Sequence, residues 1–107
     1  PSQRRFANGA VLGLWAGTAE ELLAQLKQLE RAFGRRRNRR WGERVLDCDI
    51  LAFGEAAHRS AKLVIPHPHL TRRRFALEPL AELWPDWRHP CRHRTARQLL
   101  ALLGKRR

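Results

Sequence analysis

Apolar residues recur at helical intervals early in the chain and predict an amphipathic helix over residues 19–33. The residues that carry this three- and four-residue spacing are Leu22, Leu26, Leu29 and Phe33. Thr18 and Glu21 have the spacing of a capping box at the start of this helix. Gly34 is expected to be its C-cap.

Two further helices are predicted in the second half of the chain. Residues 70–84 favour a helix, in which Pro79 is expected to introduce a kink or an interruption. Residues 85–93 are expected to be irregular, and Thr95 to cap a short final helix. The apolar residues of the two helices are Phe75, Leu77, Leu80, Leu83, Leu99, Leu100, Leu102 and Leu103.

Three stretches have the apolar alternation or composition of β-strands: residues 5–15, 45–53 and 62–65. Glycine at positions 9 and 13 weakens the first of these predictions, since glycine in a strand often marks a bulge. Gly54 and Pro66 end the second and third stretches. The chain shows no internal repeat and no second domain, so a single domain over residues 1–107 is expected.

The composition is that of one small globular domain with a hydrophobic core, since 43% of the 107 residues are hydrophobic. No apolar stretch approaches the roughly 20 residues that a membrane-spanning helix needs. The chain shows no basic-then-apolar leader, so a cytoplasmic location is expected. Two cysteines, Cys48 and Cys91, are too few for a disulfide framework and suit a reducing compartment.

The net charge of +12 is unusual, and nineteen of the 22 basic residues are arginine. Such a surface attracts polyanions, which include nucleic acid, anionic lipid and the phosphates of a nucleotide. Charge alone does not choose among these partners. The arginine excess is also explained by GC-rich coding, without any functional role.

The acidic pair Asp47-x-Asp49 lies within an otherwise apolar stretch. In a strand, residues two apart project from the same face with Cα atoms roughly 6.5–7 Å apart. Two carboxylates so placed suit a hard cation such as magnesium, which takes its remaining ligands from water and phosphate oxygens. The alternative is that both carboxylates only solvate or cap the end of a strand.

A basic segment precedes the acidic pair, over residues 35–44. Its arginines suit bidentate hydrogen bonds to a polyphosphate, and Trp41 suits stacking on a base. A solvated charge run or a nonspecific nucleic-acid patch is the alternative. Acids for magnesium next to arginines for phosphate are the two halves of a phosphoryl-transfer site.

A third group of candidate residues follows Ile65. His67 is placed to donate a hydrogen bond to a phosphate, together with an arginine of the run 72–74. A zinc site would require His67, His69, Cys91 and His93, whose spacing matches no common zinc pattern. His58 and His89 are expected to be surface residues.

These features, in this order, resemble the 6-hydroxymethyl-7,8-dihydropterin pyrophosphokinase family of the folate pathway. The most specific match is Arg40-Trp41-Gly42-x-Arg44-x-x-Asp47-x-Asp49-Ile50-x-x-Phe53-Gly54. The other matching segments are Phe6-x-Asn8, Glu30 through Arg35, Pro66-His67-Pro68, Arg73-x-Phe75 and Glu78-Pro79-Leu80-x-Glu82. Cys48 departs from the family's usual leucine between the two acids, which is a tolerable apolar exchange.

The resemblance implies a ferredoxin-like α+β sandwich with helices packed on an antiparallel sheet. It implies an ATP-dependent diphosphotransferase that moves pyrophosphate from ATP to 6-hydroxymethyl-7,8-dihydropterin and releases AMP. Two Mg²⁺ ions are expected as cofactors on Asp47 and Asp49, and a monomer that binds no nucleic acid and no membrane is expected.

The resemblance also assigns roles to individual residues. The implied catalytic residues are Arg40, Arg44, Asp47 and Asp49. The implied ATP-binding residues are Glu30, Arg35, Arg37, Trp41, Lys62, His67 and Arg73. The implied pterin-binding residues are Phe6, Asn8 and Phe75.

The matching segments cover about the last two thirds of the family's domain, over residues 1–107. The family's first strand, its Gly-Ser-Asn turn and the helix after it have no counterpart, and the chain starts at Pro1 without a methionine. A fragment or a degenerate copy is therefore expected. The alternatives for function are a basic nucleic-acid-binding module and an inactive nucleotide- or pterin-binding remnant of the family.

Overall fold

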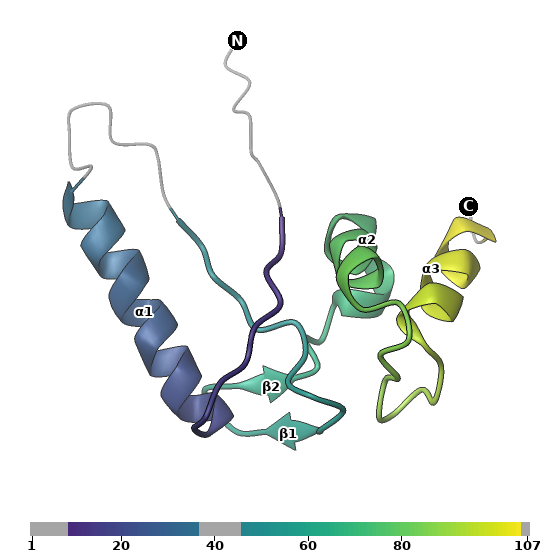
Figure 1. Ribbon diagram of the computed structural model, residues 1–107, viewed down its shortest axis with the longest axis horizontal. Coiled ribbons are helices and arrows are strands. Elements are labelled where there is room, and N and C mark those ends of the chain that lie inside the picture. Colours follow the sequence, from purple (N-terminus) through teal and green to yellow (C-terminus); the bar gives the residue numbers. More distant parts are fainter. Residues whose placement is uncertain (1–8, 37–45, 106–107) are drawn as a thin grey trace, which may run out of the picture.

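The computed structural model describes residues 9–36 and 46–105, which form an α+β structure (Figure 1). Its sheet has two antiparallel strands, and its helical part consists of three α-helices and one 3-10 turn. The elements in chain order are α1 (Ala19–Arg36), β1 (His58–Arg59), β2 (Val64–Ile65), η1 (Leu70–Arg72), α2 (Arg74–Leu83) and α3 (Ala96–Lys105). The predicted α+β class is confirmed.

Helix α1 begins with the predicted capping box. The Thr18 backbone N–H donates to Glu21 Oε1 at 2.8 Å, and the Glu21 N–H donates to Thr18 Oγ1 at 3.0 Å. The prediction that Gly34 ends the helix is wrong, because α1 continues to Arg36. Among the described glycines only Gly54 has the positive φ that a glycine C-cap adopts, so Gly34 is an ordinary helical residue.

Two of the three strand predictions are wrong over the residues that the structure describes. Neither residues 9–15 nor residues 46–53 form a strand. A strand needs a neighbouring strand whose backbone hydrogen-bonds to it. Residues 46–53 make one backbone–backbone hydrogen bond to a distant described segment, in which the His67 N–H donates to the Leu51 carbonyl oxygen at 3.0 Å. Apolar alternation is present in both stretches, but neither has a paired strand within residues 9–36 and 46–105.

The third predicted strand forms over Val64–Ile65 and pairs with a strand that the sequence did not indicate. Strand β1 pairs antiparallel with β2, with His58 opposite Ile65 and Arg59 opposite Val64. Strand β1 has only two residues, and both side chains are polar. The sequence therefore offers no apolar alternation from which this strand could be predicted.

The predicted helix over residues 70–84 is divided into η1 and α2. The break falls at Arg73, whose backbone is extended at φ −119° and ψ 111°, and Pro79 lies inside α2 without ending it. Thr95 caps α3 as predicted, since the Gln98 backbone N–H donates to Thr95 Oγ1 at 3.2 Å. The segment between α2 and α3 is irregular, as expected, apart from one isolated bridge between Arg88 and Thr95.

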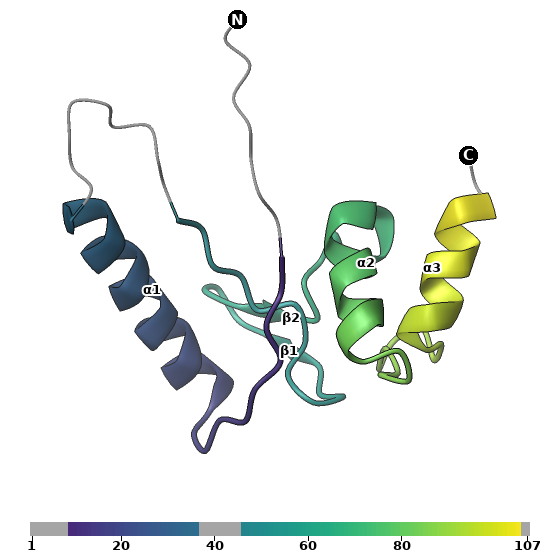
Figure 2. The same cartoon turned by 45° about the horizontal axis from the view of Figure 1, so that its top comes forward.

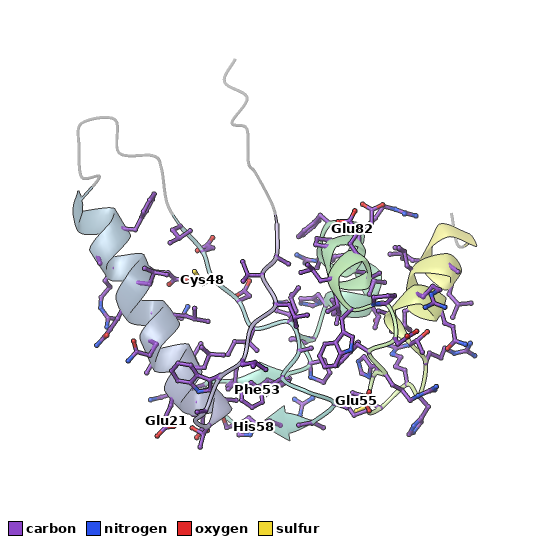
Figure 3. The ribbon with its side chains drawn as sticks, in the orientation of Figure 1. Glu21, Cys48, Phe53, Glu55, His58 and Glu82 are labelled. Atoms are coloured by element: carbon purple, nitrogen blue, oxygen red, sulfur yellow. The ribbon has the colours of Figure 1, made fainter. Side chains whose placement is uncertain are left out.

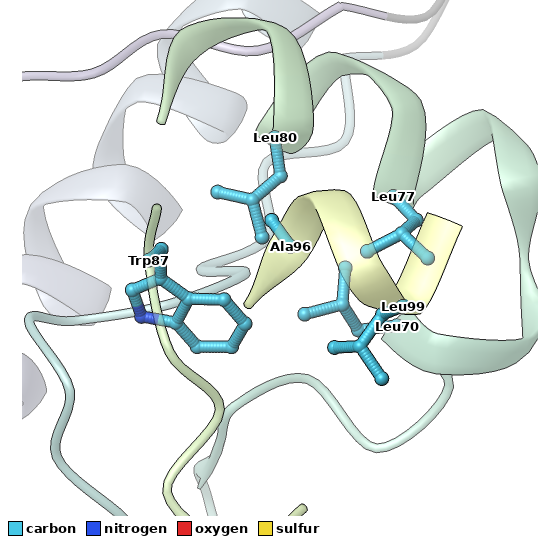
Figure 4. Close-up of a cluster of buried hydrophobic side chains, with 6 residues drawn as sticks. All are labelled: Leu70, Leu77, Leu80, Trp87, Ala96 and Leu99. Carbon is cyan, nitrogen blue, oxygen red and sulfur yellow. The ribbon is translucent and has the colours of Figure 1, made fainter. Parts of the chain in front are cut away.

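The largest buried cluster joins η1, α2, α3 and the irregular segment before α3 (Figure 4). Trp87 is fully buried in it, and its Nε1–H donates to the Gly54 carbonyl oxygen at 2.6 Å. The buried members are Leu70, Leu77, Leu80, Trp87, Ala96 and Leu99. We refer to these residues and the elements that carry them as the C-terminal cluster.

A second, smaller cluster lies between α1 and the hairpin. Ile50, Leu63 and Ile65 are buried, and Leu22, Leu23 and Leu26 of α1 pack against them. Both ribbon views show α1 on one side of the hairpin, with α2 and α3 on the other (Figures 1 and 2). Within the described ranges, no helix has the length and hydropathy needed to cross a membrane.

Candidate functional site

The acidic pair lies on a segment that runs beside α1, where Cys48 faces the helix (Figure 3). Its backbone N–H donates to Glu30 Oε2 at 2.5 Å. Cys48 is half-buried, whereas Asp47 and Asp49 on either side of it are exposed. The extended backbone therefore turns both carboxylates away from the helix surface that holds Cys48.

Glu30 was expected to contact the nucleotide. In the structure its carboxylate is bonded to other groups of the protein. Besides the Cys48 amide, its carboxylate pairs with Lys27 Nζ at 3.3 Å. Burial, and then the Glu30 carboxylate, raises the pKa of the Cys48 thiol, so the thiol stays protonated beside α1. Glu30 of α1 thus contacts the backbone between the two acids.

His67 faces the acidic pair from the segment after β2. Its Nε2 lies 4.0 Å from Asp49 Oδ2, and its Nδ1 accepts the backbone N–H of His69 at 3.1 Å. An occupied Nδ1 leaves the proton of the neutral ring on Nε2, on the side of Asp49. The structure therefore brings together two motifs that lie eighteen positions apart in the sequence, Asp49 and His67.

Lys62 lines a hollow of about 500 Å³ between α1 and the turn of the hairpin. Glu20, Leu23 and Lys27 line the same hollow from α1. Glu20 is the one acidic residue among the described residues of this lining, and Lys27 is already paired with Glu30. Lys62, which makes no ion pair with a described residue, is therefore the cation that suits a phosphate-bearing ligand. Lys27 was not among the predicted site residues, and its helical position opposite Lys62 is visible only in three dimensions.

Arg73 and Phe75 lie together at the start of α2, with the guanidinium carbon of Arg73 5.8 Å from the centre of the Phe75 ring. The Phe75 side chain is 54% exposed, which leaves much of its ring open for contact. Among the described residues no hydrogen bond or ion pair joins Arg73 to the acidic pair. The remaining predicted site residues, Phe6, Asn8, Arg37, Arg40, Trp41 and Arg44, lie outside the described residues, and Arg35 belongs to the last turn of α1.

The acidic pair fits a magnesium ion by the chemistry of its donors. Carboxylate oxygens are hard ligands, and the Asp49 side chain is 63% exposed, with His67 Nε2 4.0 Å from its Oδ2. No group of three or more histidine, cysteine, aspartate or glutamate side chains gathers to hold a metal in the described part of the chain. An ion on the pair would therefore take most of its ligands from water or a substrate, as magnesium commonly does.

One histidine was placed wrongly by the sequence. His89 was expected at the surface, but it is 8% exposed and packs edge-on against Trp87 with ring centroids 5.5 Å apart. The residue lies in an irregular segment without apolar periodicity, so no pattern indicated its burial. In the structure Trp87 and His89 are buried on either side of exposed Arg88, so the two-residue spacing of His89 from a tryptophan is the local feature that agrees with its burial.

Sequence comparison with known proteins supports the family that the order of the motifs indicated. A sequence model of the 7,8-dihydro-6-hydroxymethylpterin-pyrophosphokinase family matches residues 1–85, which include the acidic pair, Lys62, His67 and Arg73. The chain belongs to this family. The predicted family resemblance is therefore confirmed.

Curated relatives carry names of the same pyrophosphokinase family. A 2-amino-4-hydroxy-6-hydroxymethyldihydropteridine pyrophosphokinase of Synechocystis is 41% identical over 100 residues, 94% of this chain and 51% of that protein. The Pseudomonas aeruginosa protein of the same name is 47% identical over 82% of this chain and 54% of its own. The mitochondrial folate synthesis bifunctional protein of Arabidopsis thaliana is 47% identical over 76% of this chain and 15% of its own. The chain thus spans about half the length of the two bacterial pyrophosphokinases.

Proposed function

We propose that this protein transfers the pyrophosphoryl group of ATP to 6-hydroxymethyl-7,8-dihydropterin in folate biosynthesis. The observation that carries the proposal is the exposed acidic pair, held by Glu30 of α1 and faced by His67. In the reaction the hydroxymethyl oxygen forms a bond to the β-phosphorus of ATP and loses its proton. The bond from that phosphorus to the oxygen of the α-phosphate breaks, and AMP leaves with the electron pair.

In this proposal Asp47 and Asp49 hold magnesium, two ions as the resemblance implies. Bound magnesium would neutralise the phosphate oxygens and orient the nucleotide. The protein's own contribution is positioning, because phosphoryl transfer needs little covalent chemistry from side chains. The exposed carboxylates and the Nε2–H of His67 on their flank support this arrangement.

In this proposal the nucleotide is bound by two sets of cationic side chains, lysines and arginines. The hollow lined by Lys27 and Lys62 supports a phosphate-bearing ligand between α1 and the hairpin. The arginines that the resemblance assigns to ATP or to catalysis are Arg35, Arg37, Arg40, Arg44 and Arg73, with Trp41 beside them. Phe75, with Phe6 and Asn8, is proposed to bind the pterin, and its exposed ring supports this role.

We further propose that residues 1–107 are part of a larger ferredoxin-like domain, whose sheet would extend beyond the two strands β1 and β2. Residues 9–15 and 46–53 have apolar alternation, and neither stretch has a strand neighbour among the described residues. The bacterial relatives are about twice as long as the matched region, which supports a larger sheet. Magnesium, a cytoplasmic location and a monomeric state belong to the same proposal.

The experiment supplies the chain with Mg-ATP and 6-hydroxymethyl-7,8-dihydropterin and follows AMP formation. We expect Asp47→Asn and Asp49→Asn each to lower the rate by at least about 100-fold, because metal ligation contributes several kcal/mol to such transfers. Asp86→Asn is the matched control, since Asp86 is an exposed carboxylate that pairs with Arg97 at 2.7 Å outside the site. This control is expected to keep the parent rate.

Three outcomes would contradict all or part of the proposal. Equal AMP formation in the parent chain and both site variants would remove the magnesium role of the acidic pair. Salt-sensitive binding to duplex DNA without any AMP would favour a basic nucleic-acid-binding module. Mg-ATP binding that Asp47→Asn abolishes, without AMP formation, would mean that the chain binds nucleotide but does not complete the transfer.

A further inference from the structure

A second hollow, of about 450 Å³, lies between the hairpin and the turn at residues 89–92. Ile65 and Pro66, both buried, form part of its lining. The polar residues that matter for its chemistry are Arg59, His67, His89 and Arg92. The turn that carries His89 and Arg92 lies beyond the residues 1–85 matched by the family, so the family relationship assigns it no role.

The two walls of this hollow are fixed to one another by hydrogen bonds. Trp87 Nε1–H donates to the Gly54 carbonyl oxygen at 2.6 Å, and the Arg88 backbone N–H donates to Glu55 Oε2 at 3.3 Å. The hairpin wall is held by the β1–β2 pairing. The hollow is therefore built from ordered elements on both sides.

His89 contributes a buried donor that no group of the described residues uses. Its Nδ1 accepts the backbone N–H groups of Cys91 at 3.1 Å and Arg92 at 3.2 Å. The proton of the neutral ring therefore lies on Nε2. Nε2 has no hydrogen-bond partner among the described residues, although the side chain is 8% exposed. A buried donor without an acceptor is unfavourable, so this one calls for a ligand or water.

The charge around the hollow is positive. Arg59 and Arg92 are exposed lining residues, and neither makes an ion pair with a described residue. No aspartate or glutamate is among the described residues that line the hollow. Acidic groups adjoin two of its lining histidines: Glu20 Oε2 lies 3.3 Å from His58 Nε2, and Asp49 Oδ2 lies 4.0 Å from His67 Nε2. Burial, and then Arg92, lowers the pKa of His89, which keeps its ring a neutral donor.

We propose that this hollow is a binding site for a small oxyanion of phosphate size. His89 Nε2–H is the buried neutral donor, and the guanidinium groups of Arg59 and Arg92 are the charged donors. This site is separate from the acidic pair, although His67 contributes to both. It does not depend on the proposed transfer reaction.

The test titrates the full chain with inorganic phosphate and follows backbone amides and the His89 ring by NMR. We expect the Cys91 and Arg92 amides and the His89 Nε2–H to shift with one common dissociation constant. Arg92→Gln and Arg59→Gln are each expected to weaken phosphate binding about tenfold, the usual effect of losing one charged hydrogen bond. Arg97→Gln is the control, since Arg97 is exposed and pairs with Asp86 outside the hollow.

The outcomes separate a built site from general attraction to a chain of net charge +12. Equal weakening by Arg97→Gln and Arg92→Gln would overturn the proposal, as would titration without any shift at His89. A parallel titration with AMP identifies the source of the oxyanion. Equal affinity for phosphate and AMP indicates a free anion, and tighter AMP binding at the same amides indicates a nucleotide phosphate.

Discussion

The segment at residues 9–15 is at least as apolar as the elements of the C-terminal cluster, but the two regions differ greatly in burial. In the cluster, Leu70, Leu77 and Trp87 are completely buried. In the segment, Val11 is 94% exposed and Leu14 is fully exposed. Hydrophobic sequence alone therefore does not determine burial in this chain.

The difference lies in the partners that each region has. The helices α2 and α3 pack on one another and on η1, so each apolar face has a facing surface. The segment at 9–15 has an extended backbone, and no strand among the described residues lies beside it. A single strand buries little apolar surface and satisfies few backbone groups until a neighbour pairs with it. The following experiments test this contrast.

The largest expected effect is the loss of Trp87. Trp87→Ala removes a fully buried indole and its bond to Gly54, and we expect a loss of about 3–5 kcal/mol in the free energy of unfolding. Urea unfolding followed by circular dichroism measures it. The matched control, Val11→Ala, is expected to change stability by less than about 0.5 kcal/mol. Similar losses from both variants would contradict the contrast between the regions.

A smaller effect is expected for Glu30→Ala, which removes the acceptor of the Cys48 amide. An unpaired amide in a half-buried site costs about 1–3 kcal/mol, so we expect faster hydrogen exchange at Cys48. Glu30→Gln keeps an acceptor oxygen and is expected to retain most of the protection. Unchanged exchange at Cys48 in Glu30→Ala would show that α1 does not hold the acidic pair in place.

The two helix caps provide a direct comparison of the regions. Thr18→Ala and Thr95→Ala each remove one capping hydroxyl, which costs about 1 kcal/mol at the helix end. We expect Thr95→Ala to lower the global unfolding midpoint, because α3 belongs to the C-terminal cluster. Thr18→Ala is expected to raise amide exchange in α1 while the cluster stays protected. A loss of protection in both regions from either variant would mean that they unfold as one unit.

The smallest expected effect is a pH dependence of the C-terminal cluster. Burial, followed by Arg92 and His93, lowers the pKa of His89 below its ordinary value of 6.5, so the unfolded chain binds the proton more tightly. Stability is therefore fully present above the unfolded pKa and falls as the pH drops below it toward the folded pKa. Unfolding midpoints at about pH 7.5 and about pH 5 measure this, above the range in which ordinary carboxylates titrate. Equal or higher stability at the lower pH would contradict the burial of a neutral His89.

Local patterns in the sequence were sufficient for the helices and for the acidic pair. The capping residues Thr18 and Thr95 and the leucine spacing of α1 depend on contacts three or four residues apart, which the chain carries within itself. The same locality explains why the motif around Asp47 and Asp49 was recognisable without a structure. The family resemblance of the chain was read from the order of this motif and the later His67 and Arg73 motifs, and the family match over residues 1–85 agrees with it.

The tertiary structure decided everything that depends on a distant partner. Residues 46–53 alternate like a strand but form none among the described residues, while polar His58–Arg59 pairs with Val64–Ile65. The contact of Glu30 with the Cys48 amide and the burial of His89 were likewise invisible in the sequence. Sequence determines what a segment can do locally. Pairing and burial are long-range properties, because each needs a second surface that the segment itself does not encode.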